Sequence, residues 1–148
     1  MSTSPLEIVE ISALETHPLR LSVLRFDTPT KEVVFPEDEW PGSWHLGARR
    51  DGVLVATSSW VPRDHDGRPG VQLRGMATSR DLQGTGVGGH LLERGCELAR
   101  AKGFTLVWAR ARDAALAFYE RHAFVVEGEG FIDQATQLPH HLVVRTLA

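Results

Sequence analysis

Residues 83–89 are the segment of this sequence whose types and spacing most clearly indicate chemistry. They are Gln83, Gly84, Thr85, Gly86, Val87, Gly88 and Gly89. Glycine adopts positive φ without steric cost, so successive backbone N–H groups in such a run can point at one spot. A segment with helical spacing follows, and a helix N-terminus adds unpaired N–H donors and partial positive charge. The sequence therefore predicts a backbone site for a diphosphate.

The spacing of Gly84, Gly86 and Gly89 also fits the dinucleotide-binding pattern G-x-G-x-x-G. That pattern opens the first strand–helix–strand unit of its fold and precedes an acidic residue by about 20 positions. Here more than half of the chain precedes the run, and the next expected strand is followed by Arg110 and Arg112. The Lys-Ser/Thr pair of a nucleoside triphosphate loop is also missing. A dinucleotide is disfavoured, and a glycine turn without a ligand is the plain alternative.

The elements that must position this loop follow from the apolar spacing. We expect a helix over Gly88–Lys102, ended by Gly103, and shorter helices capped by Thr16 and by Asp113. The expected strands are Leu6–Ile11, Trp44–Arg49, Val53–Val61, Val71–Thr78, Phe104–Ala109, Phe124–Val126 and Leu142–Leu147. Parallel strands joined by helices lie between antiparallel hairpins, which indicates an α/β fold with a mixed, roughly seven-stranded sheet.

Length and composition limit the classes of function. The 148 residues suit one domain spanning 1–148, and a net charge of −3 gives no general field for nucleic acid. Cys96 is the single cysteine, and the seven histidines show no ligand spacing, so we expect neither a disulfide nor a metal site. With no signal-type N-terminus and no membrane-length apolar run, we expect a cytoplasmic protein without a membrane partner.

Two motifs together resemble the GNAT superfamily, the Gcn5-related N-acetyltransferases. The family signature Gln/Arg-x-x-Gly-x-Gly/Ala matches Gln83–Gly88, and the common A-x-x-F-Y-E-x-x-G-F matches Ala115–Phe124. The resemblance runs from about Val71 to the C-terminus. Two departures stand out: no Asn follows the strand that ends near Ala109, and Ala123 stands where the family usually has Gly.

The resemblance implies a cleft between two central parallel strands that binds acetyl-CoA. Its pantetheine arm would lie along Met76, Ala77 and Thr78 like an added strand, because its amides can take the ladder bonds of that backbone. Its diphosphate would lie on the glycine run. The second motif would place Ala115 and Phe118 against the cofactor and Tyr119, the only tyrosine, at the sulfur as the general acid.

The implied reaction is direct attack of an amine on a thioester, which needs an unprotonated amine and therefore a base or a water relay. His140 is the candidate base, because histidine titrates in the useful range; a solvated loop pair with His141 is the alternative. We expect a structural role for His45 and a surface role for Glu129. Arg74 and Met76 should share a strand face. Arg74 and Arg112 could bind an acidic group on the acceptor, or could be ion-paired surface residues.

The predicted function is therefore transfer of an acetyl group from acetyl-CoA to a primary amine on a small molecule or a peptide. The alternative is a module that binds or senses acyl-CoA without catalysis. We expect no nucleic-acid partner. A homodimer through paired edge strands is a further hypothesis. The connection Thr28–Ser43 is unusually long for a compact domain, and this length suggests a binding role.

Overall fold

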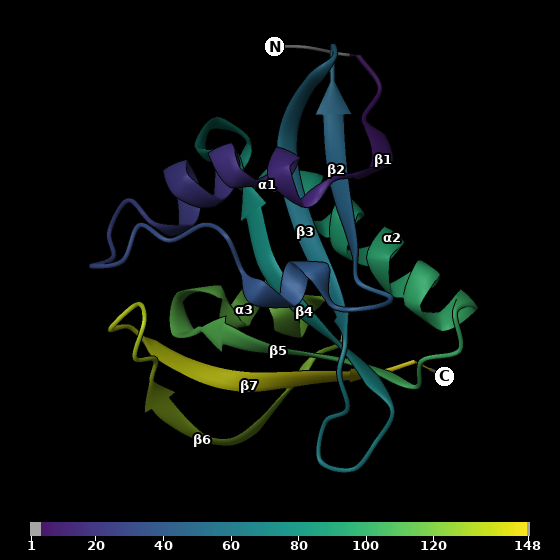
Figure 1. The fold of residues 1–148 in the computed structure, drawn as a ribbon, viewed down its shortest axis with the longest axis vertical. Coiled ribbons are helices and arrows are strands. Elements are labelled where there is room, and N and C mark those ends of the chain that lie inside the picture. Colours follow the sequence, from purple (N-terminus) through teal and green to yellow (C-terminus); the bar gives the residue numbers. More distant parts are fainter. Residues whose placement is uncertain (1–3, 148) are drawn as a thin grey trace.

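The computed structural model describes residues 4–147 and shows one twisted sheet with helices on both faces (Figure 1). Within these residues the sheet has seven strands in the order β1-β2-β3-β4-β5-β7-β6. Their bounds are β1 Glu7–Ile11, β2 Trp44–Arg50, β3 Val53–Pro62, β4 Gly70–Thr78, β5 Leu106–Arg112, β6 Val125–Ile132 and β7 Pro139–Thr146. All neighbours pair antiparallel except β4 and β5, which are parallel. The predicted mixed sheet is confirmed.

The helices are α1 Ala13–Leu19, α2 Val87–Ala101 and α3 Leu116–Arg121, and a π-helical turn, η1, follows α1 over Arg20–Leu24. Short 3₁₀ turns occupy Pro36–Glu39 (η2), Arg80–Leu82 (η3) and Asp113–Ala115 (η4). The predicted Thr16 cap is wrong. Ser12 caps α1 through a capping box with Glu15, while Thr16 is buried inside the helix. Asp113 does not cap α3 directly, because η4 precedes that helix.

Successive residues of β3 show how the two faces are covered. Side chains alternate along a strand, so Ser59 and Trp60 point in opposite directions. Ser59 accepts a hydrogen bond from Arg20 of η1 (2.7 Å), whereas the buried Trp60 indole packs against Gly95 of α2. The α1–η1 segment therefore covers one face, and α2 covers the other. Trp60, Leu91, Leu92, Val71, Val107 and Val143 form the centre of the core.

A buried ion pair fixes the connection between η1 and β2. Arg20 donates to both carboxylate oxygens of Asp38, at 2.7 and 2.9 Å, and its side chain is fully buried. Burial by itself would raise the pKa of Asp38, but the hydrogen bonds and charge of Arg20 outweigh it and hold this pKa below its usual range. Because Asp38 lies in η2, the pair holds the long connection against β3. The connection is irregular apart from η2, as predicted.

The parallel strands β4 and β5 separate soon after they pair. Their register covers only Gly70–Gln72 against Leu106–Trp108, and β4 then continues to Thr78 without that neighbour. Arg74 of β4 pairs with Ser59 of β3, and Ala77 pairs with Thr57. Two residues of β4, Gly75 and Met76, therefore lie opposite a single residue of β3, which is a β-bulge. Gly75 has φ 59°, which explains why glycine occupies this position. The splay leaves β4 backbone groups free beside a cavity.

Candidate active site

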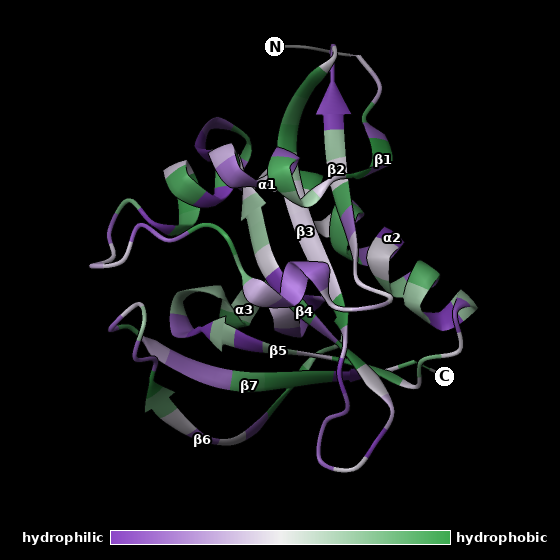
Figure 2. Cartoon of the chain, in the orientation of Figure 1, coloured by the Kyte–Doolittle hydropathy of each residue, from purple (hydrophilic) through white to green (hydrophobic). Residues whose placement is uncertain are grey.

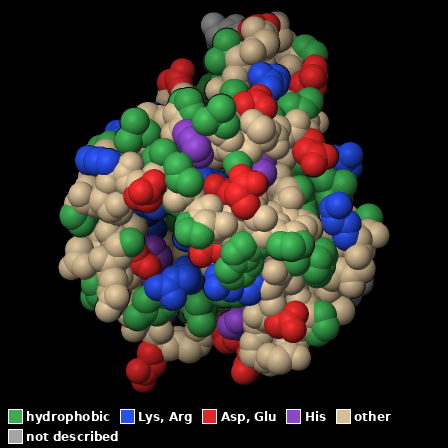
Figure 3. Space-filling view, viewed as in Figure 1, with side chains coloured by type: hydrophobic (Ala, Val, Ile, Leu, Met, Phe, Trp, Pro, Cys, Tyr) green, Lys and Arg blue, Asp and Glu red, His purple; other side chains and the backbone are tan. Residues whose placement is uncertain are grey.

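A cavity of about 240 Å³ lies where β4 and β5 separate. Figure 3 shows a hollow on this face with Lys and Arg side chains gathered around it. Six of the predicted site residues line the cavity: Arg74, Met76, Arg112, Ala115, Tyr119 and His140. They come from β4, β5, η4, α3 and β7, so the fold brings together residues that are up to 66 positions apart in sequence (140 − 74).

The glycine run begins beside this cavity and opens α2. Gly84 and Gly86 have φ of 79° and 94°, and apart from the adjacent residues in the chain no atom lies within 4 Å of a Cβ built at either position. His90 is the first residue of α2 whose amide forms a helical hydrogen bond, which it donates to the carbonyl of Gly86 at 3.0 Å. Amides ahead of it in the first turn have no intrahelical acceptor. The loop thus offers open space next to unpaired donors, which fits a phosphate group.

Several predicted cofactor residues meet at the first turn of α2. A Cβ built at Gly88 would lie 3.0 Å from Thr78 Oγ1, 3.6 Å from Met76 Cε and 3.7 Å from a ring carbon of Phe118. Gln83 Nε2 donates to the carbonyl of Thr78 at 3.0 Å, which fastens the loop to the end of β4. Thr85 bonds to the carbonyl of Leu82, and the side chains of Val87 and Ala77 are buried in the core.

The β-bulge overturns one prediction about β4. Arg74 and Met76 do not share a face. The Arg74 guanidinium lies over the Phe35 ring, 4.6 Å from its centroid, on the α1–η1 side. Met76 packs near Gly88 of α2, on the other side. The extra residue, Gly75, breaks the alternation between them. Both still line the cavity, because it opens at the splayed edge of β4.

Tyr119 lies on α3 and is 7% exposed. The Phe118 and Phe124 rings both pack edge-on against it, at centroid distances of 5.2 Å. Burial, with a smaller contribution from Cys96, raises the pKa of Tyr119 well above its usual range. The phenol is therefore protonated at any physiological pH. Among the residues that the structure describes, none is hydrogen-bonded to its hydroxyl, so this group can donate a proton into the cavity.

His140 is buried and lies in β7. The sequence had suggested that it lies in the loop before the last strand. Its Nδ1 lies 2.9 Å from the carbonyl oxygen of Leu138. A carbonyl only accepts, so Nδ1 carries the proton and Nε2 has the free lone pair in the neutral ring. Phe131 stacks on the ring at 5.9 Å. His140 therefore has the tautomer that a general base requires. Figure 2 shows that β7 is hydrophilic at its start, where His140 lies, and hydrophobic in its middle.

Arg74 and Arg112 both face the cavity, and each has an acidic neighbour. Arg74 forms an ion pair with Glu37 of η2. Arg112, the last residue of β5, donates to the carbonyl of Leu24 and lies 3.6 Å from Asp27. Burial lowers the pKa of Arg74, but guanidinium remains charged.

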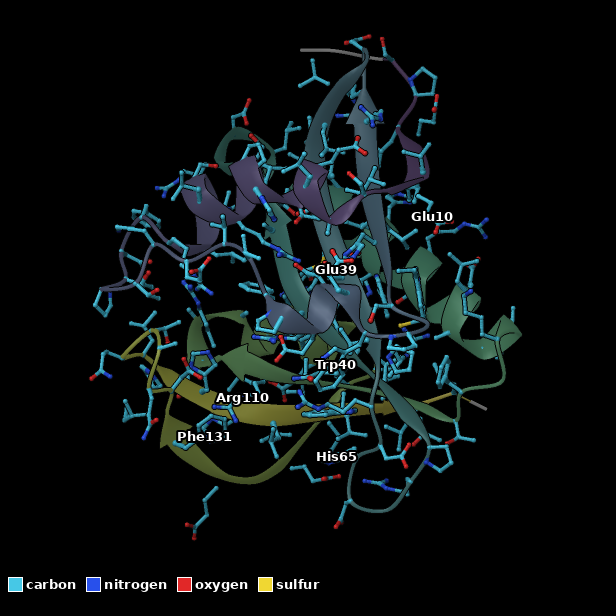
Figure 4. All side chains as sticks on the ribbon, viewed as in Figure 1. Glu10, Glu39, Trp40, His65, Arg110 and Phe131 are labelled. Carbon is cyan, nitrogen blue, oxygen red and sulfur yellow. The ribbon has the colours of Figure 1, made fainter. Side chains whose placement is uncertain are left out.

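Sequence reasoning missed two features of the cavity wall. One is Arg25, which follows η1 and is 9% exposed. The other is the pair of Arg110 and Asp133, joined at 2.9 Å, in which Asp133 also accepts from the amide and hydroxyl of Thr136 at 3.0 Å. Figure 4 shows Arg110 beside the ring of Phe131, with 4.6 Å between guanidinium and centroid. No sequence motif marks these residues. Arg25 and Asp133 lie in connections without a periodic pattern, and Arg110 lies in β5, whose pattern does not show its partner.

The remaining candidates lie away from the cavity. His45 is buried in β2, with Nδ1 2.7 Å from Ser59 Oγ, and burial lowers its pKa. Glu129 is exposed on β6. Cys96 is buried in the core, and burial raises the pKa of its thiol to about 11, which fits an inert cysteine.

Residues 4–147 contain no group of three or more His, Cys, Asp or Glu residues placed to hold a metal ion. Neither is any helix in this range long and apolar enough to cross a membrane.

Comparison with known proteins gives a consistent result. The sequence model of the acetyltransferase (GNAT) family matches residues 10–124. A curated relative, the uncharacterised N-acetyltransferase YitI of Bacillus subtilis (strain 168), is 29% identical over 129 residues, which are 85% of this chain and 87% of YitI. A crystal structure of an acyl-CoA N-acyltransferase from Pseudomonas aeruginosa is 25% identical with a TM-score of 0.79, covering 95% of this chain and 99% of the other. Escherichia coli ElaA, 20% identical with a TM-score of 0.78 and the same coverage, shares the fold.

Proposed function

The chain belongs to the acetyltransferase (GNAT) family and is an acyltransferase, and from this premise we propose that it transfers an acetyl group from acetyl-CoA to a primary amine. The observation that carries the proposal is the meeting of three groups at one splayed strand pair. These are a phosphate-type glycine loop, the protonated phenol of Tyr119, and the buried His140 with its Nε2 lone pair.

The donor site follows from the free backbone at the splay. The glycine run and the first turn of α2 would hold the diphosphate, because the amides of that first turn have no intrahelical acceptor. Within the run, the Gln83 and Thr85 amides already donate to the carbonyls of Arg80 and Leu82. The unpaired edge of β4 from Leu73 to Thr78 would bond to the pantetheine amides. Ala115 and Phe118 would line the route from the loop to the cavity, since Phe118 contacts the loop and Ala115 lines the cavity. Acetyl-CoA supplies the activated carbonyl.

The chain's own residues would then handle the protons. His140 Nε2 accepts a proton from the acceptor ammonium, directly or through water, and the free amine attacks the thioester carbonyl carbon. The backbone N–H at the bulge, near Met76, stabilises negative charge on the carbonyl oxygen. As the carbon–sulfur bond breaks, Tyr119 donates its proton to the sulfur. The attacking nitrogen then gives up its second proton, which restores the Tyr119 phenol directly or through water. The products are an amide and a free thiol, and His140 releases the proton of the acceptor ammonium to solvent.

The same architecture would serve a module that binds acyl-CoA without turning it over. His140 argues against that alternative, because a buried imidazole with a fixed proton on Nδ1 is more than binding requires. We further propose that the acceptor is a small molecule or a peptide N-terminus rather than a nucleic acid, given a net charge of −3. A homodimer through an edge strand, β1 or β6, remains part of the proposal.

The test combines binding and turnover. Calorimetry should detect acetyl-CoA binding, and Gly86→Ala should weaken it about tenfold or more, because φ 94° strains any residue with a Cβ. Thiol release from acetyl-CoA in the presence of an amine panel should show turnover. Tight binding with no turnover on any amine would favour the binding module. Absence of acetyl-CoA binding by the wild-type protein would reject the proposal.

A further inference from the structure

Arg25 lies in the cavity wall and forms no ion pair with a described residue. The residue is 9% exposed, and its side chain reaches the cavity from the segment after η1. Its hydrogen bonds go only to backbone, from Nε to the carbonyl of Glu32 at 2.9 Å and from Nη1 to that of Leu24 at 3.5 Å. No carboxylate of the described residues lies within 4 Å of it, and its Nη2 has no hydrogen-bond acceptor among them.

The other arginines of the cavity differ from Arg25 in this respect. Arg74 pairs with Glu37, Arg110 with Asp133, and Arg112 lies near Asp27. Buried guanidinium groups in proteins are normally paired, because removing a charge from water is costly without a counter-charge. An unpaired, nearly buried arginine in the wall of a binding cavity therefore needs an anion from elsewhere.

The neighbouring charges strengthen this requirement. Burial, followed by repulsion from Arg112 and Arg74, lowers the pKa of Arg25, although a guanidinium stays protonated. Asp133 opposes them from across the cavity, but it is already engaged by Arg110 and Thr136. The surplus of positive charge faces the space where an acceptor would lie, and an oxyanion there would relieve the repulsion.

We propose that the acceptor is a small amine that also carries an anionic oxygen group, a carboxylate or a phosphate, and that Arg25 binds this group while the amine faces His140. This inference rests on the proposed function. A cavity of about 240 Å³ suits a small molecule. Guanidinium is suited to the anion, because its planar fork donates two parallel hydrogen bonds to a carboxylate or phosphate.

Matched pairs of amines test the inference. One arm compares 4-aminobutyrate with butylamine, and a second compares phosphoethanolamine with ethanolamine, so that each pair differs chiefly in the anionic group. For each compound we would measure kcat/KM by thiol release and, independently of turnover, binding to the wild-type protein by calorimetry. At least one anionic amine should exceed its neutral partner about tenfold or more in both measurements, which fits a charge-assisted hydrogen bond. The arm that responds identifies carboxylate or phosphate.

Variants assign the effect to Arg25. Arg25→Gln should reduce the ratio of anionic to neutral amine to about one, while Arg25→Lys, which keeps the charge but loses the fork, should retain part of it. Arg94→Gln, in an exposed ion pair on α2, is the matched control and should keep the full ratio. Circular dichroism establishes whether each variant is folded. If Arg25→Gln does not fold, the ratio of anionic to neutral amine measured on the wild-type protein still tests the anionic acceptor.

The outcomes separate this inference from the proposed function. Equal or better use of the neutral amines overturns the anionic acceptor, and a ratio that survives in Arg25→Gln overturns the role of Arg25 in binding it. Both results leave acetyl transfer intact. Binding of the anionic amines that depends on Arg25, without turnover of any amine, supports the anion site and rejects the enzyme. No binding of either anionic amine, together with turnover of neutral amines, also overturns the inference.

Discussion

Gly95 of α2 lies directly against the indole ring of Trp60 on β3. A Cβ built at Gly95 would stand 1.8 Å from Trp60 Cζ2 and 2.4 Å from two further ring atoms. Trp60 is fully buried and stacks on Trp44 at 5.9 Å, so the ring has no space to move away. The helix that begins at the glycine run therefore sits on the sheet at a distance set by this one contact. Its N-terminus is positioned beside β4 as a consequence.

We expect Gly95→Ala to destabilise the protein. Alanine favours a helix over glycine by about 1 kcal/mol, but overpacking a rigid core costs about 1–3 kcal/mol and a contact of this kind lies at the upper end. Urea denaturation should show a net loss of about 1–2 kcal/mol. Arg100→Ala, at an exposed position of the same helix, should change stability by less than about 0.5 kcal/mol. A stabilised Gly95→Ala protein would contradict the contact.

Tyr119→Phe should lower kcat by about a hundredfold, because the departing sulfur loses its proton donor. The dissociation constant for acetyl-CoA should change little, since the ring and its packing against Phe118 and Phe124 are kept. Pre-steady-state thiol release and calorimetry measure the two quantities. Full turnover in the variant would remove Tyr119 from the chemistry. A parallel loss of acetyl-CoA affinity would assign the residue to binding instead.

His140→Gln should lower kcat/KM for the amine about a hundredfold near pH 7. The deficit should shrink as pH rises toward the pKa of the acceptor amine, because the amine then loses its proton without help. A pH–rate profile of variant and wild type measures this. His141→Gln is the matched control, since the His141 ring bonds to Asp113 at 2.6 Å and does not line the cavity. A deficit of equal size at every pH would indicate a structural role.

Ala123→Gly should stabilise the protein. Ala123 has φ 65° just after α3, a left-handed conformation that costs a residue with a Cβ about 1–2 kcal/mol. Glycine removes this cost but loses about 0.4–1 kcal/mol through its more flexible unfolded chain. A net gain of about 0.5–1 kcal/mol should raise Tm by a few degrees. Ala117→Gly, at an exposed position within α3, should instead lower Tm.

We expect Asp133 to stabilise the folded protein at neutral pH and to lose this effect in acid. Burial would raise its pKa, but hydrogen bonds from Arg110 and Thr136 outweigh it and lower the pKa to about 2. A depressed pKa contributes stability above the unfolded value of about 3.9, and this is lost as pH falls through about 2. Its full size is about 2 kcal/mol. Asp133→Asn should therefore reduce the free energy of unfolding at pH 7. Between pH 5 and 2 the variant should also lose less stability than the wild type does.

The control for that titration is Asp64→Asn, the same change at an exposed acid in the β3–β4 loop. Its stability should follow pH as the wild type does. Urea denaturation at several pH values measures all three proteins. If Asp133→Asn and the wild type lost stability in parallel between pH 5 and 2, the lowered pKa of Asp133 would be excluded as the cause.

Features that depend on local spacing could be predicted from the sequence. The period of apolar residues predicted α2 and most strands, and the glycine run and the segment from Ala115 to Phe124 identified the family. Such signals are readable because backbone geometry fixes the period of a helix or strand. Glycine at positive φ is similarly a local requirement, as Gly86 shows.

Only the tertiary structure decided which side chains share the cavity. The bulge at Gly75 placed Arg74 and Met76 on opposite faces, although strand alternation predicts one face. The Leu138 carbonyl accepts a hydrogen bond from His140 and so keeps the proton of the neutral ring on Nδ1, and strand pairing places His140 opposite Arg112. Arg25 became an unpaired charge because the surrounding carboxylates pair with other arginines. These properties depend on long-range pairing and on competition between charges, which one-dimensional spacing does not encode.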